Sequence, residues 1–453
     1  MSEVMSEVLG NSHGGSVPHL SERAVSLGNT GASLQMGLGV LGAVALSVGI
    51  LVGLNGWLDV DPTFFWRSYL VSFCFILSMS LGGLFFVFVQ HLTRAGWSVA
   101  VRRPAEILAS NLRWIWLLWV VPFGWLFLKG QSGVLWPWSN PAEMKLHNPA
   151  EWHIIEKKIG YFSLFGLFDG DFFWARAIAY FAVWAFLAHY FLSRSLRLGA
   201  TGDRRIIGSM QKVAAPAAIL FALSVSFAAF DWIMSLSPAW FSTMFGVYFF
   251  TGCCTLGFAA IIVTCTQLQA SGALVGVITK EHYQDLGKLL FAFGMVFWAY
   301  IGFSQYMLIW YANIPEETTW FLPRQAGGWG MLSFALLFGH FVIPFLGLIS
   351  KWPKRNTAVL TFAALWMAAF GWLDLYWLIM PVVPTDVGTF TRISDFYAAH
   401  AGDTTRLLHP LHFCLLLGMV GLFGYFTLGA LRKLPLVCER DPRLGDSLRF
   451  ENI

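Results

Sequence analysis

Residues 227–250 read FAAFDWIMSLSPAWFSTMFGVYFF, an apolar stretch that contains one carboxylic acid, Asp231, and one proline, Pro238. Apolar runs of about 20 residues are long enough to cross a bilayer as a helix, and proline disfavours a helix interior. The stretch therefore predicts the end of one membrane-spanning helix, a tight turn at residues 237–239, and the start of the next helix. A charged carboxylate at the bilayer centre costs about 2.5–3.5 kcal/mol on insertion scales, so acids in spanning helices face protein and are functional candidates.

The composition of the whole chain is that of a polytopic membrane protein. Of its 453 residues, 57% are hydrophobic and 12% are charged, whereas about a quarter of the residues in a soluble domain are charged. The net charge of +4 is too small to indicate a nucleic-acid partner. The predicted fold is all-α, with ten transmembrane helices near residues 34–57, 66–90, 107–128, 172–192, 214–235, 240–267, 287–311, 328–350, 357–382 and 408–431.

The basic residues between the predicted spans are distributed unevenly. Most Lys and Arg residues outside the spans fall on the side that carries both termini, so the positive-inside rule predicts cytoplasmic termini. Residues 1–33 then form a cytoplasmic arm, residues 408–453 form the last helix and a cytoplasmic tail, and loops 129–171 and 383–407 are periplasmic. In the first loop, residues 152–168 mix lysines with apolar side chains and predict either an interfacial helix or a docking surface.

An internal repeat predicts two four-helix bundles, formed by helices two to five and helices six to nine, with the first and last helices at the periphery. Residues 34–235 hold helices one to five, and residues 236–407 hold the second bundle. Each bundle carries a histidine on its third helix and, on its fourth, an aspartate seven residues before a proline: His189 and Asp231, then His340 and Asp374. Equivalent helices thus carry equivalent titratable groups.

Further polar side chains near these groups follow helical spacing. Tyr248 and Thr251 share a face of the sixth helix, and Ser304 lies on a polar face of the seventh with Gln305 beside it. Together with the acids and histidines, these groups could relay protons through ordered water or bind a quinone carbonyl. The alternative is ordinary interhelical hydrogen bonding, at about 0.6 kcal/mol for each bond.

Metal and haem sites are not predicted in this chain. The six cysteines form no CxxC or CxxCH motif, which argues against c-type haem attachment and cysteine-ligated clusters. Each bundle core offers one histidine, whereas haem b in membranes takes a histidine pair. His91, His409 and His412 are expected at the membrane interface or the protein surface. We therefore expect no covalently bound or metal-bound cofactor.

Four blocks of this sequence are similar to those of a known membrane-protein family: SFCFILSMSLGGLFFVFVQHLTRAGWSVAVRR (72–103), FDWIMSLSPAWFSTMFGVYFFTG (230–252), DLGKLLFAFGMVFWAYIGFSQYMLIWYANIPEET (285–318) and DLYWLIMP (374–381). From about residue 34 to 432, the chain resembles the NrfD-like, or polysulfide-reductase-type, membrane subunits. Within that family it is most similar to the second NrfD-like subunit of alternative complex III, a quinol:cytochrome c oxidoreductase. One departure is at residues 237–239, which lack the acid and histidine often found there in the family, and this weakens a proton-exit role for the turn.

The resemblance implies an integral subunit of a quinol-oxidising respiratory or photosynthetic complex in the bacterial inner membrane. The implied partners are a paralogous NrfD-like subunit, an iron-sulfur subunit, multihaem cytochrome c subunits, small membrane subunits and lipids. The implied ligand is menaquinone or ubiquinone. The buried acids and histidines would either bind this quinone or conduct protons across the membrane.

Two other functions remain open. The chain could be a purely architectural anchor in which the acids are fold-specific hydrogen-bond partners. It could also be a secondary transporter with a solute site at the membrane midplane. The scarcity of helix-interrupting Gly and Pro near mid-depth disfavours the transporter.

Overall fold

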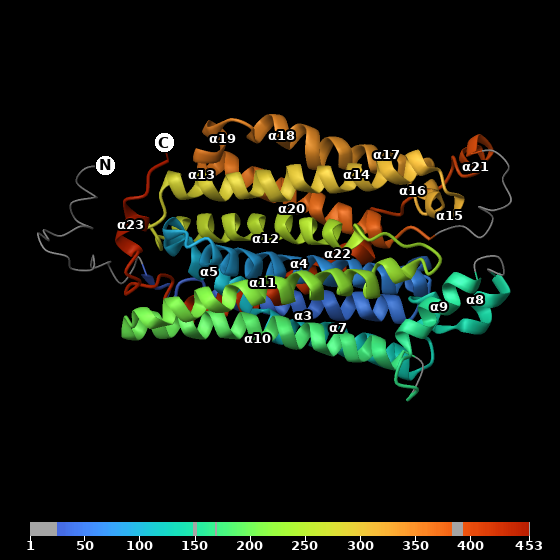
Figure 1. The fold of residues 1–453 in the computed structure, drawn as a ribbon, viewed down its shortest axis with the longest axis horizontal. Coiled ribbons are helices and arrows are strands. Elements are labelled where there is room, and N and C mark those ends of the chain that lie inside the picture. Colours follow the sequence, from blue (N-terminus) through green and yellow to red (C-terminus); the bar gives the residue numbers. More distant parts are fainter. Residues whose placement is uncertain (1–24, 148–151, 168–169, 383–392, 453) are drawn as a thin grey trace, which may run out of the picture.

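The computed structural model describes residues 25–147, 152–167, 170–382 and 393–452, which form helices joined by short connections (Figure 1). Within these residues, ten helical spans are long and apolar enough to cross a membrane, which confirms the predicted fold class. The spans are α3 (Ala32–Leu54), α4 (Pro62–Leu92), the series α5 (Val99–Ser110), α6 (Leu112–Ile115) and α7 (Leu117–Leu128), α10 (Asp171–Thr201), α11 (Arg204–Trp232), α12 (Phe245–Ala270), the series α13 (Lys280–Leu289), η6 (Leu290–Val296) and α14 (Phe297–Ala312), the series α17 (Gly327–Leu336), η7 (Leu337–Val342) and α18 (Ile343–Leu348), α20 (Thr357–Ile379) and α22 (Pro410–Lys433).

Shorter helices lie in the connections or, for η2 (Gly96–Ser98) and η5 (Met234–Leu236), at one end of a span. They are η1 (Trp57–Asp59), η2 (Gly96–Ser98), η3 (Ser132–Val134), η4 (Pro137–Ser139), α8 (Pro141–His147), α9 (Trp152–Phe162), η5 (Met234–Leu236), α15 (Pro315–Thr318), α16 (Leu322–Gln325), α19 (Lys351–Arg355), α21 (Ile393–Ala399) and α23 (Leu444–Leu448).

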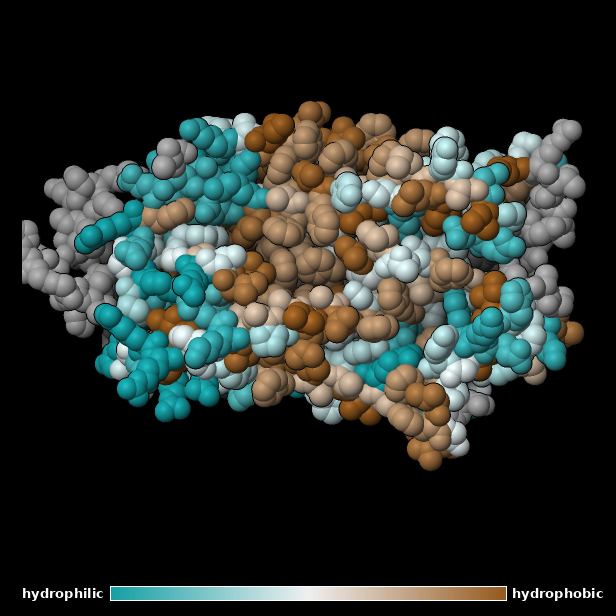
Figure 2. All heavy atoms as spheres, viewed as in Figure 1, coloured by the Kyte–Doolittle hydropathy of each residue, from teal (hydrophilic) through white to brown (hydrophobic). Residues whose placement is uncertain are grey.

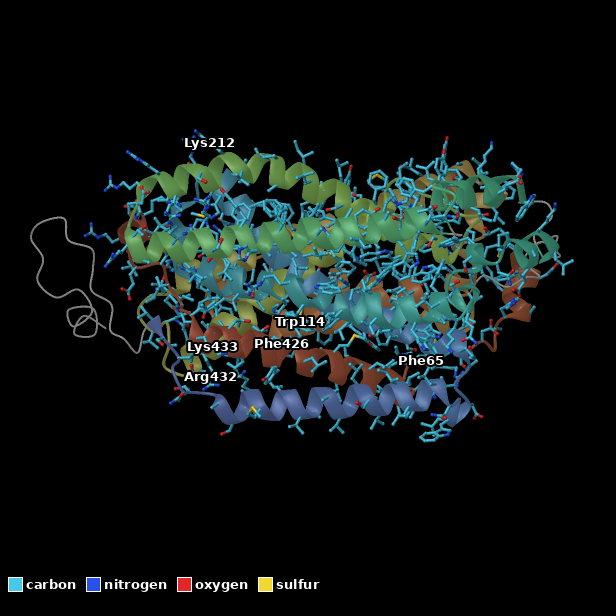
Figure 3. The ribbon with its side chains drawn as sticks, turned by 90° about the horizontal axis from the view of Figure 1, so that it is seen from below. Phe65, Trp114, Lys212, Phe426, Arg432 and Lys433 are labelled. Atoms are coloured by element: carbon cyan, nitrogen blue, oxygen red, sulfur yellow. The ribbon has the colours of Figure 1, made fainter. Side chains whose placement is uncertain are left out.

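The spans run side by side along the long axis of the molecule and define two ends. The C-terminal helix α23 lies at one end, here called the terminal end, and α8, α9, α15 and α21 lie at the other, the loop end (Figure 1). Apolar side chains form a band between two polar ends (Figure 2), as expected where the middle of a protein lies in lipid. Lys212, Arg432 and Lys433 all lie at the terminal end (Figure 3). This is the end that the distribution of basic residues predicts to be cytoplasmic.

Helix α4 is the most buried of the spans and packs against α5, α11, α12, α20 and α22. Its contact with α12 is made by two glycines. A Cβ atom placed on Gly82 would lie 2.6 Å from the Cα atom of Gly257, so a larger residue at either position would force the helices apart. Small residues at such crossings let helix backbones approach closely in membranes. The same device joins α3 to α22, where a Cβ atom on Gly42 would lie 2.6 Å from the backbone nitrogen of Leu422.

The connection between α11 and α12 is longer than the sequence predicts. We expected a tight turn at residues 237–239 and a sixth span from residue 240, but α11 ends at Trp232, η5 follows, and α12 begins at Phe245. The buried indole of Trp240 explains the difference. It stacks on Trp320 with a centroid distance of 4.4 Å and donates a hydrogen bond to the carbonyl oxygen of Glu317, which holds the connection at the loop end.

Part of the 152–168 segment forms helix α9, whereas residue 168 lies outside the described residues. Ile155 and Phe162 are buried, and Lys158 Nζ donates a 2.5 Å hydrogen bond to the carbonyl oxygen of Trp240. Tyr161 is exposed on the same helix. One face of α9 therefore packs on protein, and both predicted roles for its other face stay open.

The helix contacts do not separate two bundles cleanly. Helices α4, α5 and α10 contact one another, and α11 contacts α4 and α10. Helix α12 contacts η6, α14 and α20, but α4 and α12 also pack directly together and α20 contacts α4. The two groups thus share a central pair of helices. The division into two bundles and the domain boundaries stay predictions.

Candidate functional site

Asp231 and Asp374, which occupy equivalent positions in the predicted internal repeat, have different surroundings in the structure. Asp231 lies in the last turn of α11 and is buried. Arg176 on α10 reaches both of its carboxylate oxygens, with Nε 2.8 Å from Oδ2 and Nη2 2.9 Å from Oδ1. Tyr180, one turn further along α10, donates a 2.7 Å hydrogen bond to Oδ2. A two-pronged Arg–carboxylate pair is both strong and geometrically specific, so Asp231 ties α10 to α11.

Sequence reasoning missed Arg176 because it lies inside an apolar run that predicts a span. A signal was present: Arg176 and Tyr180 are four residues apart and therefore share a helix face. A cation buried in a spanning helix needs a carboxylate partner. The neighbouring span offers one near the same depth.

The described neighbours of Asp374 include no such cation. This acid lies on α20, is 2% exposed, and accepts a 2.6 Å hydrogen bond from the hydroxyl of Tyr248 and a 3.3 Å bond from Nε1 of Trp298. Among the described residues, no Lys, Arg or His side chain lies within 4.0 Å of its carboxyl group. Two neutral donors thus surround a buried acid, which leaves it able to exist in protonated or ionised form.

His340 contacts Trp298, the same residue that donates a hydrogen bond to Asp374, and it is positioned by two π-helical segments, η6 and η7. A π-helical turn releases backbone carbonyls from the usual helical pattern, and such turns occur frequently at functional sites. Here the carbonyl oxygen of Gly294 in η6 lies 3.1 Å from Nε2 of His340 in η7 and also accepts a 2.7 Å bond from Thr255. The imidazole stacks on Trp298 with a centroid distance of 4.0 Å. Its Nδ1 atom has no partner among the described residues.

A cavity of about 920 Å³ opens next to Tyr248 and Trp298. Its walls come from α12, η6, α14, α16, α17, η7, α20 and α21, and aromatic side chains dominate them. Phe303 on α14 and Phe334 on α17 line it and are exposed on the outer surface of the spans. The volume lies in the range of about 300–1,000 Å³ that is typical of small-molecule sites. Asp374 and His340 lie behind this wall rather than in it.

The loop end of the cavity is polar and cationic. Arg324 of α16 is 1% exposed and donates hydrogen bonds to the carbonyl oxygens of Trp320, Trp377 and Leu378. Trp377 and Leu378 belong to the last turn of α20, whose carbonyls have no helical partner, so Arg324 caps that helix. Burial, with a smaller contribution from neighbouring Arg67, holds the pKa of the Arg324 guanidinium well below its usual value.

A chain of side-chain hydrogen bonds crosses the rim of the cavity. Gln325 donates through Nε2 to the hydroxyl of Tyr306 at 2.9 Å and accepts at Oε1 from the hydroxyl of Tyr397 at 2.6 Å. Tyr397 belongs to α21, so the loop-end helix is tied to the rim. These groups line the cavity together with Gln305.

The predicted site residues divide into two groups. Tyr248 and Gln305 line the cavity. Thr251 follows Tyr248 by about one helical turn on α12, and its hydroxyl donates a 2.6 Å hydrogen bond to the carbonyl oxygen of Tyr248. Ser304 is half-buried but does not line the cavity, and His189 is exposed on α10, in the other helix group. The structure therefore gathers Asp374, Tyr248, His340 and Gln305 around one cavity and separates the remaining candidates from it.

Two histidines expected at the interface or surface are buried instead. His91 is 0% exposed and stacks on Phe191, and His412 is 1% exposed between Phe64, Trp372 and Tyr376. Both lie near helix ends, where the sequence predicts hydration, but a neighbouring helix covers each ring. His409 follows the expectation more closely because it is partly exposed and caps α22.

A search for metal sites in the described part of the chain finds no group of three or more His, Cys, Asp or Glu side chains suited to hold a metal ion. Comparison of the chain with protein-family models and with curated proteins finds no match. Function is therefore inferred from the residues and their geometry.

Proposed function

We propose that this chain is an integral, quinone-interacting subunit of a quinol-oxidising electron-transfer complex, similar to the NrfD-like subunits and, among them, to the second such subunit of alternative complex III. The observation that supports this proposal is the aromatic cavity of about 920 Å³ beside a buried acid that has no cationic partner within the described residues. Menaquinone or ubiquinone combines a flat ring, polar carbonyl oxygens and an apolar tail. The cavity offers a partner for each.

The fit follows from the side chains that line the cavity. The aromatic walls can stack on a flat ring, and Gln305, Tyr248 and Arg324 supply polar atoms that can orient ring oxygens. Phe303 and Phe334 stand at the outer surface of the spans, where an isoprenoid tail can leave toward lipid. A few polar groups that fix orientation inside an apolar pocket are typical of small-molecule sites.

The acid behind the wall supplies a route for protons. Oxidation of a quinol to a quinone releases two protons and two electrons, so a site for this reaction needs a proton acceptor. Tyr248 lines the cavity and its hydroxyl already touches Asp374, so a proton leaving the cavity can pass through this hydroxyl to the carboxylate. The electrons would pass to iron-sulfur and multihaem cytochrome c subunits of the same complex.

The architectural alternative applies to Asp231 rather than to the chain as a whole. Its paired oxygens are already bound to Arg176 and Tyr180, which favours a role in joining α10 to α11. The proposed location is the bacterial inner membrane with both termini cytoplasmic, and the gathering of basic side chains at the terminal end supports this orientation.

The test measures quinol oxidation by the purified complex for Gln305→Leu, Asp374→Asn and the matched control Ser304→Ala. Ser304 neighbours Gln305 but does not line the cavity. Loss of one buried hydrogen-bonding group costs about 1–3 kcal/mol, so Gln305→Leu should raise the KM for quinol about tenfold. Asp374→Asn should lower kcat or the protons moved per electron while the complex still assembles. If both variants match Ser304→Ala in assembled complexes, the proposal is wrong.

A further inference from the structure

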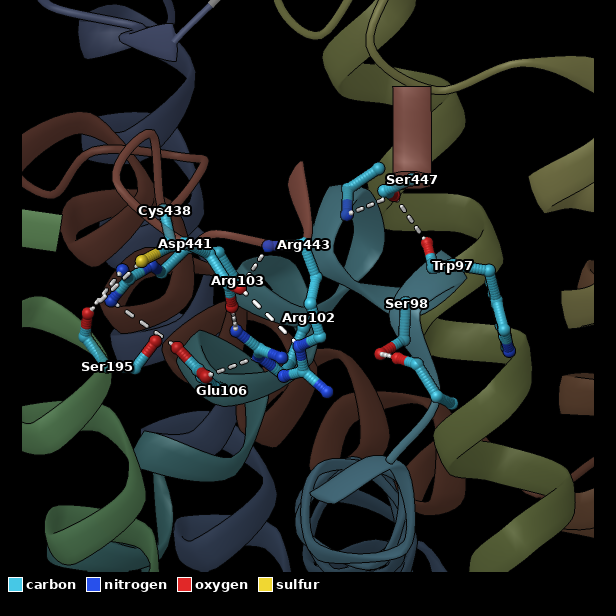
Figure 4. A network of polar contacts seen from close by, with 12 residues as sticks. Trp97, Ser98, Arg102, Arg103, Glu106, Ser195, Cys438, Asp441, Arg443 and Ser447 are labelled. Carbon is cyan, nitrogen blue, oxygen red and sulfur yellow. Dashed lines mark hydrogen bonds and ion pairs between the residues drawn. The ribbon is translucent and has the colours of Figure 1, made fainter. Parts of the chain in front are cut away.

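A second cluster of charged side chains lies at the terminal end, far from the cavity. Arg102, Arg103 and Glu106 of α5 are 1–2% exposed. The segment that follows α22 folds back over them and contributes Asp441 and Arg443 (Figure 4). These five residues, which we call the arginine cluster, meet across more than 300 positions of sequence.

The arginine cluster carries an excess positive charge. Asp441 Oδ2 lies 2.8 Å from Nη2 of Arg102, and Arg102 and Arg103 share Glu106 at 3.4 Å each. The pKa of the Asp441 carboxyl is held below its usual range by Arg102, although burial opposes the shift. Within the described residues, no further carboxylate lies within 4.0 Å of these guanidinium groups. Three cations thus face two anions.

The cluster also has more hydrogen-bond donors than acceptors. In the described chain, Nε of Arg103 and both Nη atoms of Arg443 are buried and have neither a hydrogen-bond partner nor an ion-pair partner. Nη1 of Arg103 and Nε of Arg443 meet a carboxylate only at 3.4 and 3.5 Å, the Glu106 oxygens have only such ion-pair contacts, and the Arg443 side chain as a whole is 19% exposed. His91 on α4 is also buried, and both of its ring nitrogens lack a hydrogen-bond partner in the described chain. Buried polar groups in native proteins are nearly always satisfied by protein, water or an ion. Buried charges that lack a counter-charge are costlier still.

We infer that the arginine cluster binds a small monovalent inorganic anion, of which chloride is the simplest, at the unpartnered N–H groups of Arg103 and Arg443. Water could satisfy the free N–H groups but would leave the excess positive charge in place. A single negative charge removes that excess, whereas a divalent oxyanion would reverse it. The close enclosure of Arg102 and Arg103 also favours a single-atom ion over a polyatomic one.

The anion would hold the C-terminal segment against the helices. Besides Asp441 and Arg443, this segment contacts α5 through Ser447, whose hydroxyl accepts from the backbone N–H of Ala100 at 3.2 Å. It also reaches α13 through Asn452, whose side chain donates to the carbonyl oxygen of Glu281 at 3.1 Å. A counter-ion under the segment would therefore stabilise a connection between the two helix groups.

The experiment changes the net charge of the arginine cluster in opposite directions with two variants and includes one control variant. Arg443→Gln removes the excess positive charge, and Glu106→Gln raises it by one. Arg449→Gln makes the same substitution on the same segment at an exposed position. The readout is the Tm of the purified protein, or of the complex that contains it, in chloride and in gluconate at equal ionic strength.

Chloride should raise the Tm of the wild type and of Arg449→Gln by a few degrees over gluconate, because a ligand that binds only the folded state stabilises it. The chloride effect should vanish in Arg443→Gln and reach half-maximum at a chloride concentration about tenfold lower in Glu106→Gln. In bromide-soaked crystals, an anomalous peak should lie beside Arg103 and Arg443. Equal Tm values in both salts for the wild type and a cluster without an anomalous peak would show that water alone fills it, and the inference would be wrong.

Discussion

Arg176→Met and Asp231→Asn, made singly and together, test whether Asp231 is a structural tie or a working carboxylate. Removing one partner of a buried ion pair costs about 3–5 kcal/mol, and an exposed pair contributes about 0–1 kcal/mol. The Arg176 and Asp231 side chains are 19% and 6% exposed, nearer the buried limit. Arg176→Met should therefore cost about 3 kcal/mol of unfolding free energy, at the low end of the buried range.

The reverse substitution should cost less. Asparagine keeps the shape of Asp231 and its bond to Tyr180, and the partly exposed Arg176 keeps its 3.2 Å bond to the carbonyl oxygen of Tyr161. Asp231→Asn should cost about 1–2 kcal/mol, and the double variant should cost about 2 kcal/mol less than the sum of the single variants. Arg197→Met, at an exposed position on the same helix, is the matched control and should cost less than about 0.5 kcal/mol.

The assay is reversible unfolding in mixed detergent micelles, combined with quinol turnover for each assembled complex. Our reasoning predicts lower stability and unchanged turnover in the assembled fraction for Asp231→Asn. Two results would refute it: a coupling energy below about 0.5 kcal/mol, within the usual error of additivity, or a loss of turnover in the assembled fraction as large as that of Asp374→Asn.

Three further predictions concern other parts of the chain. His189→Ala should change neither stability nor turnover, because the side chain is exposed on α10, and a turnover defect would restore it as a site residue. Burial lowers the pKa of Lys158 from 10.5 to about 8, so between these pH values the unfolded state binds more protons than the folded state. The contribution of Lys158 to stability should therefore increase as pH rises from about 8 to 10.5. Lys158→Met should remove the resulting rise in Tm, and the control Lys157→Met, at an exposed position, should keep it. Gly82→Leu should prevent assembly because the larger side chain would separate α4 from α12. Gly347→Ala should be tolerated because there is open space around the added methyl group. An assembled Gly82→Leu protein would contradict the packing described above.

The sequence predicts the spans well because span length and hydropathy are set locally. All ten predicted runs overlap the observed helices. The largest discrepancies at span starts lie at the third, fifth and seventh spans, which begin earlier, at Gly96, Arg204 and Lys280, and the fourth span ends later than predicted, at Thr201 rather than residue 192. Polar residues at those starts hide the helix from a hydropathy pattern. Helix formation there depends on packing with the C-terminal segment and other elements, which local composition does not report.

The sequence points to some of the residues around the cavity. The internal repeat singles out Asp374, and the polar faces of the sixth and seventh helices point to Tyr248 and the neighbouring Gln305; these three lie in or just behind one cavity wall. The difference between Asp374 and Asp231 could not be predicted, because it depends on which neighbour each acid meets across a helix interface. The role of Arg324 as a cap could not be predicted either, because it depends on the end of α20, more than 50 residues later.

The arginine cluster lay beyond sequence reasoning for a related reason. Arg102 and Arg103 form part of a basic stretch whose natural interpretation is a solvated helix end. In the folded chain both are buried, Arg103 donates to the carbonyl oxygen of Ser195 on α10, and the C-terminal segment supplies Asp441 to Arg102. Spacing within one helix predicts shared faces, but it does not predict which distant segment covers them.

The most direct test of the central claim is the position of a quinone in a high-resolution map of the assembled complex prepared with a menaquinol or ubiquinol analogue. Our account predicts ring density in the cavity between α14 and α17, within hydrogen-bond distance of Gln305 or Tyr248 and separated from Asp374 by the Tyr248 hydroxyl. Density that contains only lipid chains in this cavity, with the quinone ring bound elsewhere in the complex, would contradict it.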